Sequence, residues 1–150
     1  MIDREARNRL AESLRQLGSG RISNDEFEGR RSDSSPDRAI DAIYDQAWFL
    51  YSDLREHTLT GLDRLSPDVR HAVVRWIVFL YSDLEYQWPE CPLYGLRGAL
   101  FNMVTLGRSG RAAAATWGSA GDVGVWPFID QSHLAVARSK PRLLAAAMPN

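Results

Sequence analysis

A hexapeptide that occurs twice is the strongest constraint on how this 150-residue chain can fold. Phe-Leu-Tyr-Ser-Asp-Leu spans residues 49–54 and again residues 79–84. Each copy lies late in a segment whose apolar residues recur every three or four positions, and each segment opens with Ser-Pro-Asp, at residues 35–37 and 66–68. Such spacing places apolar side chains on one face of a helix. The repeat therefore predicts two long helices, which we expect to pack antiparallel.

The ends of the two repeat helices can also be predicted. We expect the first helix to begin after an N-cap at Ser35, because proline is favoured at the first helical position, and to run to about residue 56 or 57. The second should begin after Ser66 and end before Trp88-Pro89, since proline disfavours helical geometry in the residue before it. Residues 72–81 are apolar nearly all round, which is typical of a helix at the centre of a bundle.

The first thirty residues predict a helical hairpin. Apolar residues at helical spacing indicate a helix over residues 3–17, which Gly18-Ser19-Gly20 should end. Ser23 and Glu26 have the spacing of a capping box that starts a second, short helix. The apolar residues of the first helix are Ala6, Leu10, Leu14 and Leu17.

Residues 14–27 carry a recognisable pattern. A leucine-spaced helix leads into Gly-Arg-Ile-Ser at residues 20–23, and Glu26-Phe27 follow after two more residues. This pattern resembles the SHOCT-like helical hairpin of many bacterial proteins, and the likeness covers about residues 3–31. The resemblance implies an accessory module for oligomerisation or protein contacts, with no catalytic residues to carry over. The remainder is similar to small bacterial proteins of uncharacterised function, which implies no activity.

The C-terminal part is less regular, and we expect the whole chain to form one domain of mostly all-α fold. Within residues 1–150 we distinguish the helical hairpin at 1–31 from a main helical body at 36–150. The expected C-terminal elements are a helix over 96–106, a break at 107–111, a loop-like segment at 112–121, an extended segment or tight turn at 122–128, and short helices at about 130–138 and 141–147.

Composition favours a soluble globular protein. The chain is 45% hydrophobic and 25% charged, and no apolar run approaches the roughly 20 residues of a membrane span. The N-terminus is charged and lacks a signal peptide's apolar core. Cys91 is the single cysteine, so an internal disulfide is excluded and we expect a cytoplasmic location without membrane contact.

Charge is unevenly distributed along the chain. Residues 1–90 hold 17 acids and 12 bases, whereas residues 91–150 hold 2 acids and 6 bases. A basic tail can bind nucleic acid, or it can pack against the acidic part of the same chain. We favour packing, because the basic residues are scattered among apolar ones and form no phosphate-binding cluster.

Asp53 and Asp83 are the sharpest candidates for a binding site. They hold equivalent positions in the two copies of the hexapeptide, so they could face one paired-acid or metal site, with His57, Glu85 and Glu90 as the nearest further ligands. The alternative, which we favour, is that arginines of the C-terminal part bind each carboxylate. The candidate arginines are Arg97, Arg108 and Arg111.

Trp126 and Phe128 flank a proline and are the second candidate binding site. If exposed, they would anchor a protein partner, because tryptophan is enriched in interface hot spots. The alternative is that they cover one end of the bundle. The remaining reactive residues show neither the spacing of metal ligands nor a nucleophile beside its base, so we expect no catalytic residue, metal or cofactor. These residues are His57, His71, His133 and Cys91.

Three functions remain open. The first is a non-enzymatic protein-interaction or regulatory module that binds a protein partner or forms a homodimer; an antitoxin- or immunity-like role is one form, because residues 32–90 carry 11 acids and 5 bases. The second is a small metal-dependent or acid/base hydrolase that uses Asp53 and Asp83. The third is nucleic-acid binding through the basic C-terminal part. No feature indicates a particular small-molecule ligand.

Overall fold

The fold is mostly helical, which confirms the predicted class. The computed structural model describes residues 1–31, 35–89 and 115–139, and these ranges contain no β-strand beyond an isolated bridge between Ser23 and Thr58. Residues 115–119 are also helical. The named elements are α1 (Arg4–Gly18), α2 (Asn24–Gly29), α3 (Arg38–Ala47), η1 (Trp48–Leu50), η2 (Gly61–Asp63), α4 (Pro67–Tyr81), η3 (Val123–Val125) and α7 (Gln131–Ser139).

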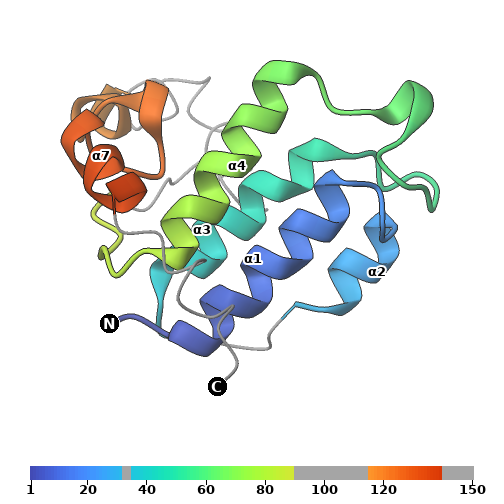
Figure 1. Ribbon diagram of the computed structural model, residues 1–150, viewed down its shortest axis with the longest axis horizontal. Helices are drawn as coiled ribbons and strands as arrows, with labels where there is room; N and C mark the ends of the chain where they lie inside the picture. The colour runs from blue at the N-terminus through green and yellow to red at the C-terminus, as the bar shows by residue number, and fades with distance from the viewer. Residues whose placement is uncertain (32–34, 90–114, 140–150) are drawn as a thin grey trace, which may run out of the picture.

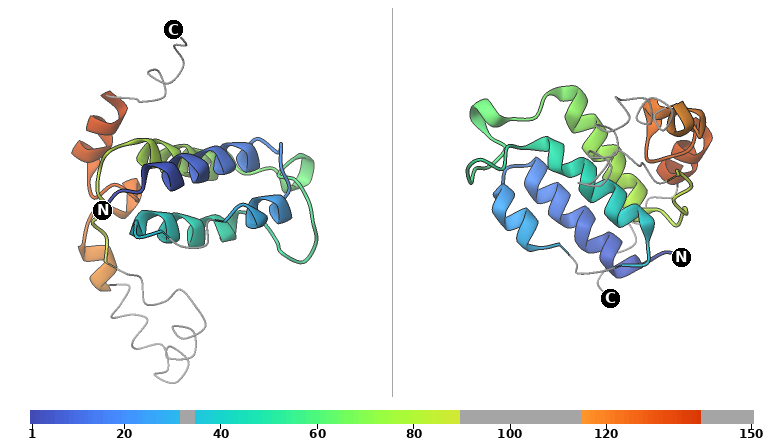
Figure 2. Two further views of the ribbon diagram at one scale, coloured as in Figure 1. Left: turned by 90° about the horizontal axis from the view of Figure 1, so that it is seen from below. Right: turned by 180° about the vertical axis from the view of Figure 1, so that it is seen from behind.

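Four helices are arranged in two layers (Figures 1 and 2). Seen edge-on, α1 and α4 form one layer and α2 and α3 form the other. The helix α4 runs antiparallel to α1 and α3. The predicted antiparallel direction of the two repeat helices is therefore confirmed, but their direct pairing is wrong, since α1 is the main helical partner of both.

The helix α1 is the centre of this body because it contacts the other three helices. Its predicted apolar stripe is buried, with Leu14 and Leu17 fully enclosed. Burial extends beyond that stripe to Ala11, Ser13 and Arg7. The N-terminal hairpin is thus part of the main core, with the capping box of Ser23 and Glu26 formed as predicted.

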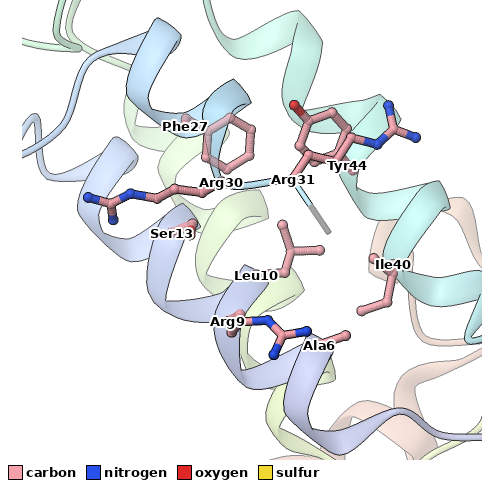
Figure 3. A pocket seen from close by; sticks show the side chains of 9 residues that line it. All are labelled: Ala6, Arg9, Leu10, Ser13, Phe27, Arg30, Arg31, Ile40 and Tyr44. Atoms are coloured by element: carbon pink, nitrogen blue, oxygen red, sulfur yellow. The ribbon is translucent and has the colours of Figure 1, made fainter. Parts of the chain in front are cut away.

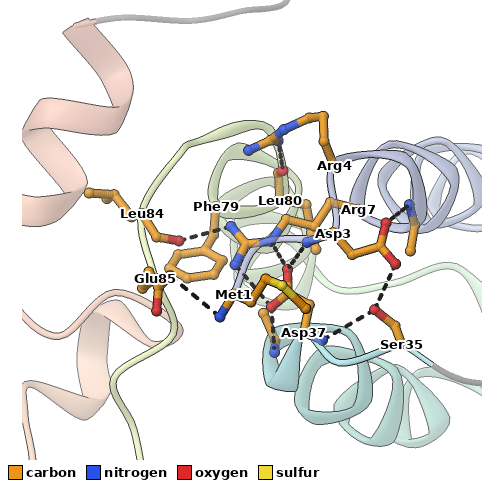
Figure 4. Close-up of polar contacts among 12 residues, drawn as sticks. Met1, Asp3, Arg4, Arg7, Ser35, Asp37, Phe79, Leu80, Leu84 and Glu85 are labelled. Atoms are coloured by element: carbon orange, nitrogen blue, oxygen red, sulfur yellow. Dashed lines mark hydrogen bonds and ion pairs between the residues drawn. The ribbon is translucent and has the colours of Figure 1, made fainter.

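A buried ion pair joins α1 to the start of α3 (Figure 4). Arg7 is fully buried and Asp37 is 3% exposed, with Nε and Oδ2 2.5 Å apart. A second Arg7 bond, Nη2 to Oδ1 of Asp37, measures 3.1 Å. The Arg7 Nη1 group donates to the carbonyls of Ser82 and Leu84, and the Phe79 ring lies 5.1 Å from the guanidinium carbon. Arg7 therefore connects α1, α3 and the segment that follows α4.

The neighbouring polar groups complete this network. Asp37 also accepts the backbone N–H groups of Asp3 and Ala39. Asp3 caps α1 by accepting the Ala6 N–H, and Ser35 donates its hydroxyl to the same carboxylate. These two hydrogen bonds, that from Ala6 first, lower the pKa of Asp3 below its usual value.

The start of α3 differs from the predicted one. Asp37, rather than Ser35, is the N-cap, so the helix begins two residues later than predicted and Pro36 lies outside it. The cause is tertiary: the Asp37 carboxylate is needed at the helix end for Arg7, and Ser35 is used to bind Asp3 and the Asp37 amide.

The predicted extent of the first repeat helix is wrong, because α3 ends at Ala47 and continues only as the short η1. The side chain of Asn24 donates to the carbonyls of Ser52 and Arg55, and it accepts the His57 N–H at 2.7 Å. The Asn24 backbone N–H donates to the His57 carbonyl. These contacts hold residues 52–57 in a non-helical path across the start of α2.

The second repeat helix begins as predicted but ends early. Ser66 caps α4 and Pro67 occupies its first turn, whereas its last residue is Tyr81, well before Trp88. The prediction of a helix buried all round is also wrong: Val74 is 56% exposed. One face of α4 packs on α1. The buried residues of the whole helix are Val73, Trp76, Phe79 and Leu80.

The described C-terminal residues pack on the other side of α4 through aromatic rings. Trp126 meets Trp76 edge-on at 5.7 Å, and the indole N–H of Trp88 donates to the Phe128 carbonyl. The expected turn at 122–128 is present and includes η3 and a cis peptide bond between Trp126 and Pro127. The expected terminal helix at 130–138 is confirmed as α7, whereas residues 115–119 are helical rather than loop-like.

Several expected elements lie outside the described residues. These are the helix at 96–106, the break at 107–111 and the helix at 141–147. Within the described ranges, no helix has the length and apolar character needed to cross a membrane.

The buried ion pair predicts a large effect of removing one partner. We expect Arg7→Met to destabilise the protein by about 3–5 kcal/mol, because the Asp37 charge would stay buried without its counter-ion. The exposed Arg9, which pairs with Glu5, is the matched control: Arg9→Met should change stability by less than about 1 kcal/mol. Urea unfolding followed by circular dichroism measures both, and equal effects would contradict this role of Arg7.

Two glycines with positive φ predict different costs. Gly20 (φ 70°) and Gly61 (φ 55°) both adopt the left-handed conformation. A Cβ atom at Gly20 would lie 2.4 Å from Cγ2 of Thr60, whereas at Gly61 it would meet nothing within 4 Å. Gly61→Ala should cost about 1–2 kcal/mol from backbone strain alone. We expect Gly20→Ala to cost clearly more in the same unfolding measurement; equal costs would show that the Thr60 contact relaxes freely.

Candidate interaction surface

Asp83, the second predicted acid, is bound by an arginine from an unpredicted place. It lies just beyond α4, and its Oδ1 is 2.6 Å from Nη2 of Arg4 at the start of α1. Arg4 also donates to the carbonyls of Leu80 and Ser82. An arginine does neutralise Asp83, but it belongs to α1; the predicted candidates Arg97, Arg108 and Arg111 lie outside the described residues.

Asp53 lies at the opposite end of α1. It is exposed and follows Ser52, whose carbonyl accepts from Asn24, the residue that begins α2. Asp83, in contrast, binds Arg4, the residue that begins α1. A 15-residue helix is about 22 Å long, so α1 separates the two acids by roughly this distance. The prediction that Asp53 and Asp83 share a paired-acid or metal site is therefore wrong.

The other predicted ligands do not assemble around either acid. Over residues 1–31, 35–89 and 115–139, no group of three His, Cys, Asp or Glu side chains is placed to hold a metal ion. His57 has its Nδ1 2.9 Å from the Arg55 carbonyl, and Glu85 pairs with the N-terminal amine of Met1. Glu90 and Cys91 lie outside the described residues.

Trp126 and Phe128 are core residues. Trp126 is 7% exposed and Phe128 is fully buried. The Trp126 indole N–H donates to the Tyr86 hydroxyl at 3.2 Å, and Phe128 packs on Phe79 with ring centroids 5.1 Å apart. The exposed anchor predicted at residues 126–128 is therefore wrong, and the alternative that these rings cover the bundle is correct.

Two clefts are candidate small-molecule sites. The first, between α1, α2 and α3, is apolar at its base and bordered by Arg9, Arg30 and Arg31 (Figure 3). Its volume of about 20 Å³ suits about one water molecule. The second, about 120 Å³, is lined by Arg7 and Asp37, which bind each other. Both are far below the roughly 300–1,000 Å³ of ordinary ligand pockets.

The most unusual surface lies on the segment between α3 and α4. Leu54 is 91% exposed and Leu62 is 106% exposed, values that leave these side chains with almost no protein contact. Phe49 is 71% exposed and Trp48 is 45% exposed. We call Trp48, Phe49, Leu54 and Leu62 the connection surface. These four side chains lie on one segment, and exposed apolar patches on a monomer often mark binding sites.

The segment that carries the connection surface is fastened in place. Its middle is tied to the start of α2 by the bonds of Asn24, by the bridge from Ser23 to Thr58 and by a 2.7 Å bond from the Ser23 hydroxyl to Glu56. Arg55, next to Leu54, is 2.8 Å from Asp63, next to Leu62. A surface held in this way loses little conformational entropy on binding, which favours affinity.

Tyr51, near the start of this segment, has a raised pKa. Burial raises the pKa of the Tyr51 phenol, and the Glu28 carboxylate raises it further. Tyr51 therefore stays neutral at physiological pH, and its ring packs edge-on against Phe27 at 6.2 Å. The contact of Tyr51 with the hairpin thus fixes the start of the segment, while the next five residues, Ser52 to Glu56, are exposed.

The phenylalanine and the last leucine of the hexapeptide have different environments in the two copies. Phe79 is 1% exposed, whereas its counterpart Phe49 is 71% exposed. Leu84 is partly buried against the core, whereas its counterpart Leu54 is almost wholly exposed. Sequence reasoning missed the connection surface because it treated the copies as equivalent. The available signal was Leu54, an apolar residue within the polar run from Ser52 to Thr58.

No protein-family model, no curated protein and no solved structure matched this chain. The SHOCT-like character of residues 3–31 therefore stays a prediction, and the geometry of the chain itself carries the functional argument.

A matched pair of tryptophans tests the distinction between core and surface. We expect Trp126→Ala to destabilise the protein by about 3–5 kcal/mol, because it removes a buried ring. Trp48→Ala should cost clearly less than Trp126→Ala, since nearly half of the Trp48 side chain already faces solvent. Urea unfolding measures both free energies. Far-UV circular dichroism is the suitable signal, because each variant lacks one of the tryptophans that give the protein its fluorescence. A large cost for Trp48→Ala would place Trp48 in the core and remove it from the connection surface.

Proposed function

We propose that this protein is a non-enzymatic interaction module that binds another protein chain through the connection surface. The single observation that carries the proposal is the near-complete exposure of Leu54 and Leu62 on a segment fastened by hydrogen bonds and an ion pair. A regulatory role in the cytoplasm and the accessory role implied by the SHOCT-like resemblance belong to the same proposal.

The energetics favour a docking role for these side chains. Burying one leucine or phenylalanine side chain contributes about 1.5–3 kcal/mol. Three such residues with a tryptophan can form the central cluster of an interface, where a few residues provide most of the binding free energy. In the free protein this apolar area faces water, so a partner that covers it gains the corresponding free energy.

The hydrolase alternative loses its structural basis. Asp53 and Asp83 lie at opposite ends of α1, and Asp83 is bound by Arg4. The nucleic-acid alternative depends on six basic residues beyond residue 90, of which only Arg138 lies in the described part. It stays a prediction of the sequence, whereas the connection surface has a defined geometry.

The proposal is tested with a double variant of the two most exposed leucines. Affinity capture from native lysate and multi-angle light scattering should show a protein partner or a self-associated form with the wild type. Leu54→Ser with Leu62→Ser should reduce that association at least about tenfold, because it removes apolar contact area worth more than about 1.4 kcal/mol. Its circular dichroism spectrum and unfolding midpoint should match the wild type.

The matched control is Val74→Ser with Val136→Ser. These valines are 56% and 49% exposed and lie on α4 and α7, outside the segment that carries the connection surface. This control should associate like the wild type. A wild type that is strictly monomeric and captures nothing above background would overturn the proposal, as would a leucine variant that associates normally.

A further inference from the structure

We propose that the partner segment docked on the connection surface is basic and amphipathic, with lysine or arginine beside leucine or aromatic residues, and that it comes from another protein rather than a second copy of this chain. This inference rests on the proposed function and adds the chemistry of the partner. It derives from the charges that surround the apolar side chains.

Acidic residues border the connection surface. The whole connection, residues 48–66, carries three acids and two arginines, and α2, to which it is fastened, carries three acids and no base. Together they hold a formal charge of −4, from 6 acids and 2 bases. The acids are Asp53, Glu56 and Asp63 on the connection and Asp25, Glu26 and Glu28 on α2.

Contacts within the protein neutralise few of these acids. One acid, Asp63, forms an ion pair with Arg55 within the connection. Glu56 and Glu26 accept hydrogen bonds from Ser23, which orient the carboxylates without neutralising them. Asp25 and Asp53 are exposed. Leu54 and Leu62 therefore lie on a segment that, together with α2, carries a net negative formal charge.

This net negative charge favours a different protein over a second copy as the partner. A two-fold symmetric dimer brings the same patch of both chains face to face, so Asp53 and Glu56 of one copy would meet the same acids of the other. Like charges across an interface weaken association, whereas complementary charges speed encounter and select the partner. A basic amphipathic segment satisfies both the exposed leucines and the acids that border them.

Selection from an unbiased peptide library tests the inference. A displayed library of random 16-residue peptides is selected on the wild-type protein and, in parallel, on Leu54→Ser/Leu62→Ser. We expect peptides enriched on the wild type to carry net positive charge together with leucine, phenylalanine or tryptophan. Peptides selected on the leucine variant should lack this apolar enrichment. Enrichment of acidic or neutral peptides on the wild type, or identical sequences from both selections, would overturn the inference.

Charge variants then separate the acids at this surface from acids elsewhere. Asp25→Asn/Asp53→Asn should weaken the best selected peptide by about three- to tenfold, and raising the salt concentration should weaken wild-type binding in the same direction. Glu5→Gln/Glu85→Gln is the matched control, because both acids are exposed and lie toward the other end of α1. Equal affinity of the Asp25→Asn/Asp53→Asn variant and the control variant would contradict the role of charge.

The oligomeric state separates failure of this inference from failure of the proposed function. A wild type that dimerises, and loses dimerisation in Leu54→Ser/Leu62→Ser, would keep the connection surface as an interaction site but overturn the basic partner. A wild type that neither associates nor selects peptides would overturn both.

Discussion

The buried pair of Arg7 and Asp37 is the contact on which the arrangement of the helices depends. An isolated charge in a protein interior is strongly unfavourable, so each of these groups requires the other in place. Because Arg7 also binds the carbonyls of Ser82 and Leu84, the start of α3 and the exit of α4 must meet at the same turn of α1. The pair acts as a geometric constraint that fixes which helix ends lie together.

The hydrogen bonds of Asn24, at the start of α2, keep a segment out of a helix. Asn24 binds backbone groups of Ser52, Arg55 and His57, which a longer α3 would use within its own helix. The chain therefore leaves the helix after η1 and crosses the start of α2. Leu54 falls in the middle of this crossing and faces solvent. The same contacts that end the helix early thus create and hold the connection surface.

This arrangement favours protein binding over catalysis. The acids that looked equivalent in sequence are held at the two ends of α1. Of the two clefts described above, one has room for about one water molecule and the other is lined by the Arg7–Asp37 ion pair. The exposed leucines, in contrast, lie on a segment held by hydrogen bonds and an ion pair, and acidic residues are their neighbours in the sequence. Apolar contact area provides affinity and the surrounding charge selects the partner, which together define a docking site.

Local sequence determined the elements that depend on nearby residues alone: the apolar stripe of α1, the capping box at Ser23, the start of α4 at Ser66 and the helix α7. Periodicity and capping act over one or two turns, so they can be read from sequence. Tertiary structure alone decided that Arg7 is buried and that Phe49 faces solvent while Phe79 is enclosed. Identical hexapeptides have identical local preferences. Their environments differ because Asn24 binds the carbonyls of Ser52 and Arg55 at the end of the first copy, whereas Arg4 and Arg7 bind carbonyls of the second.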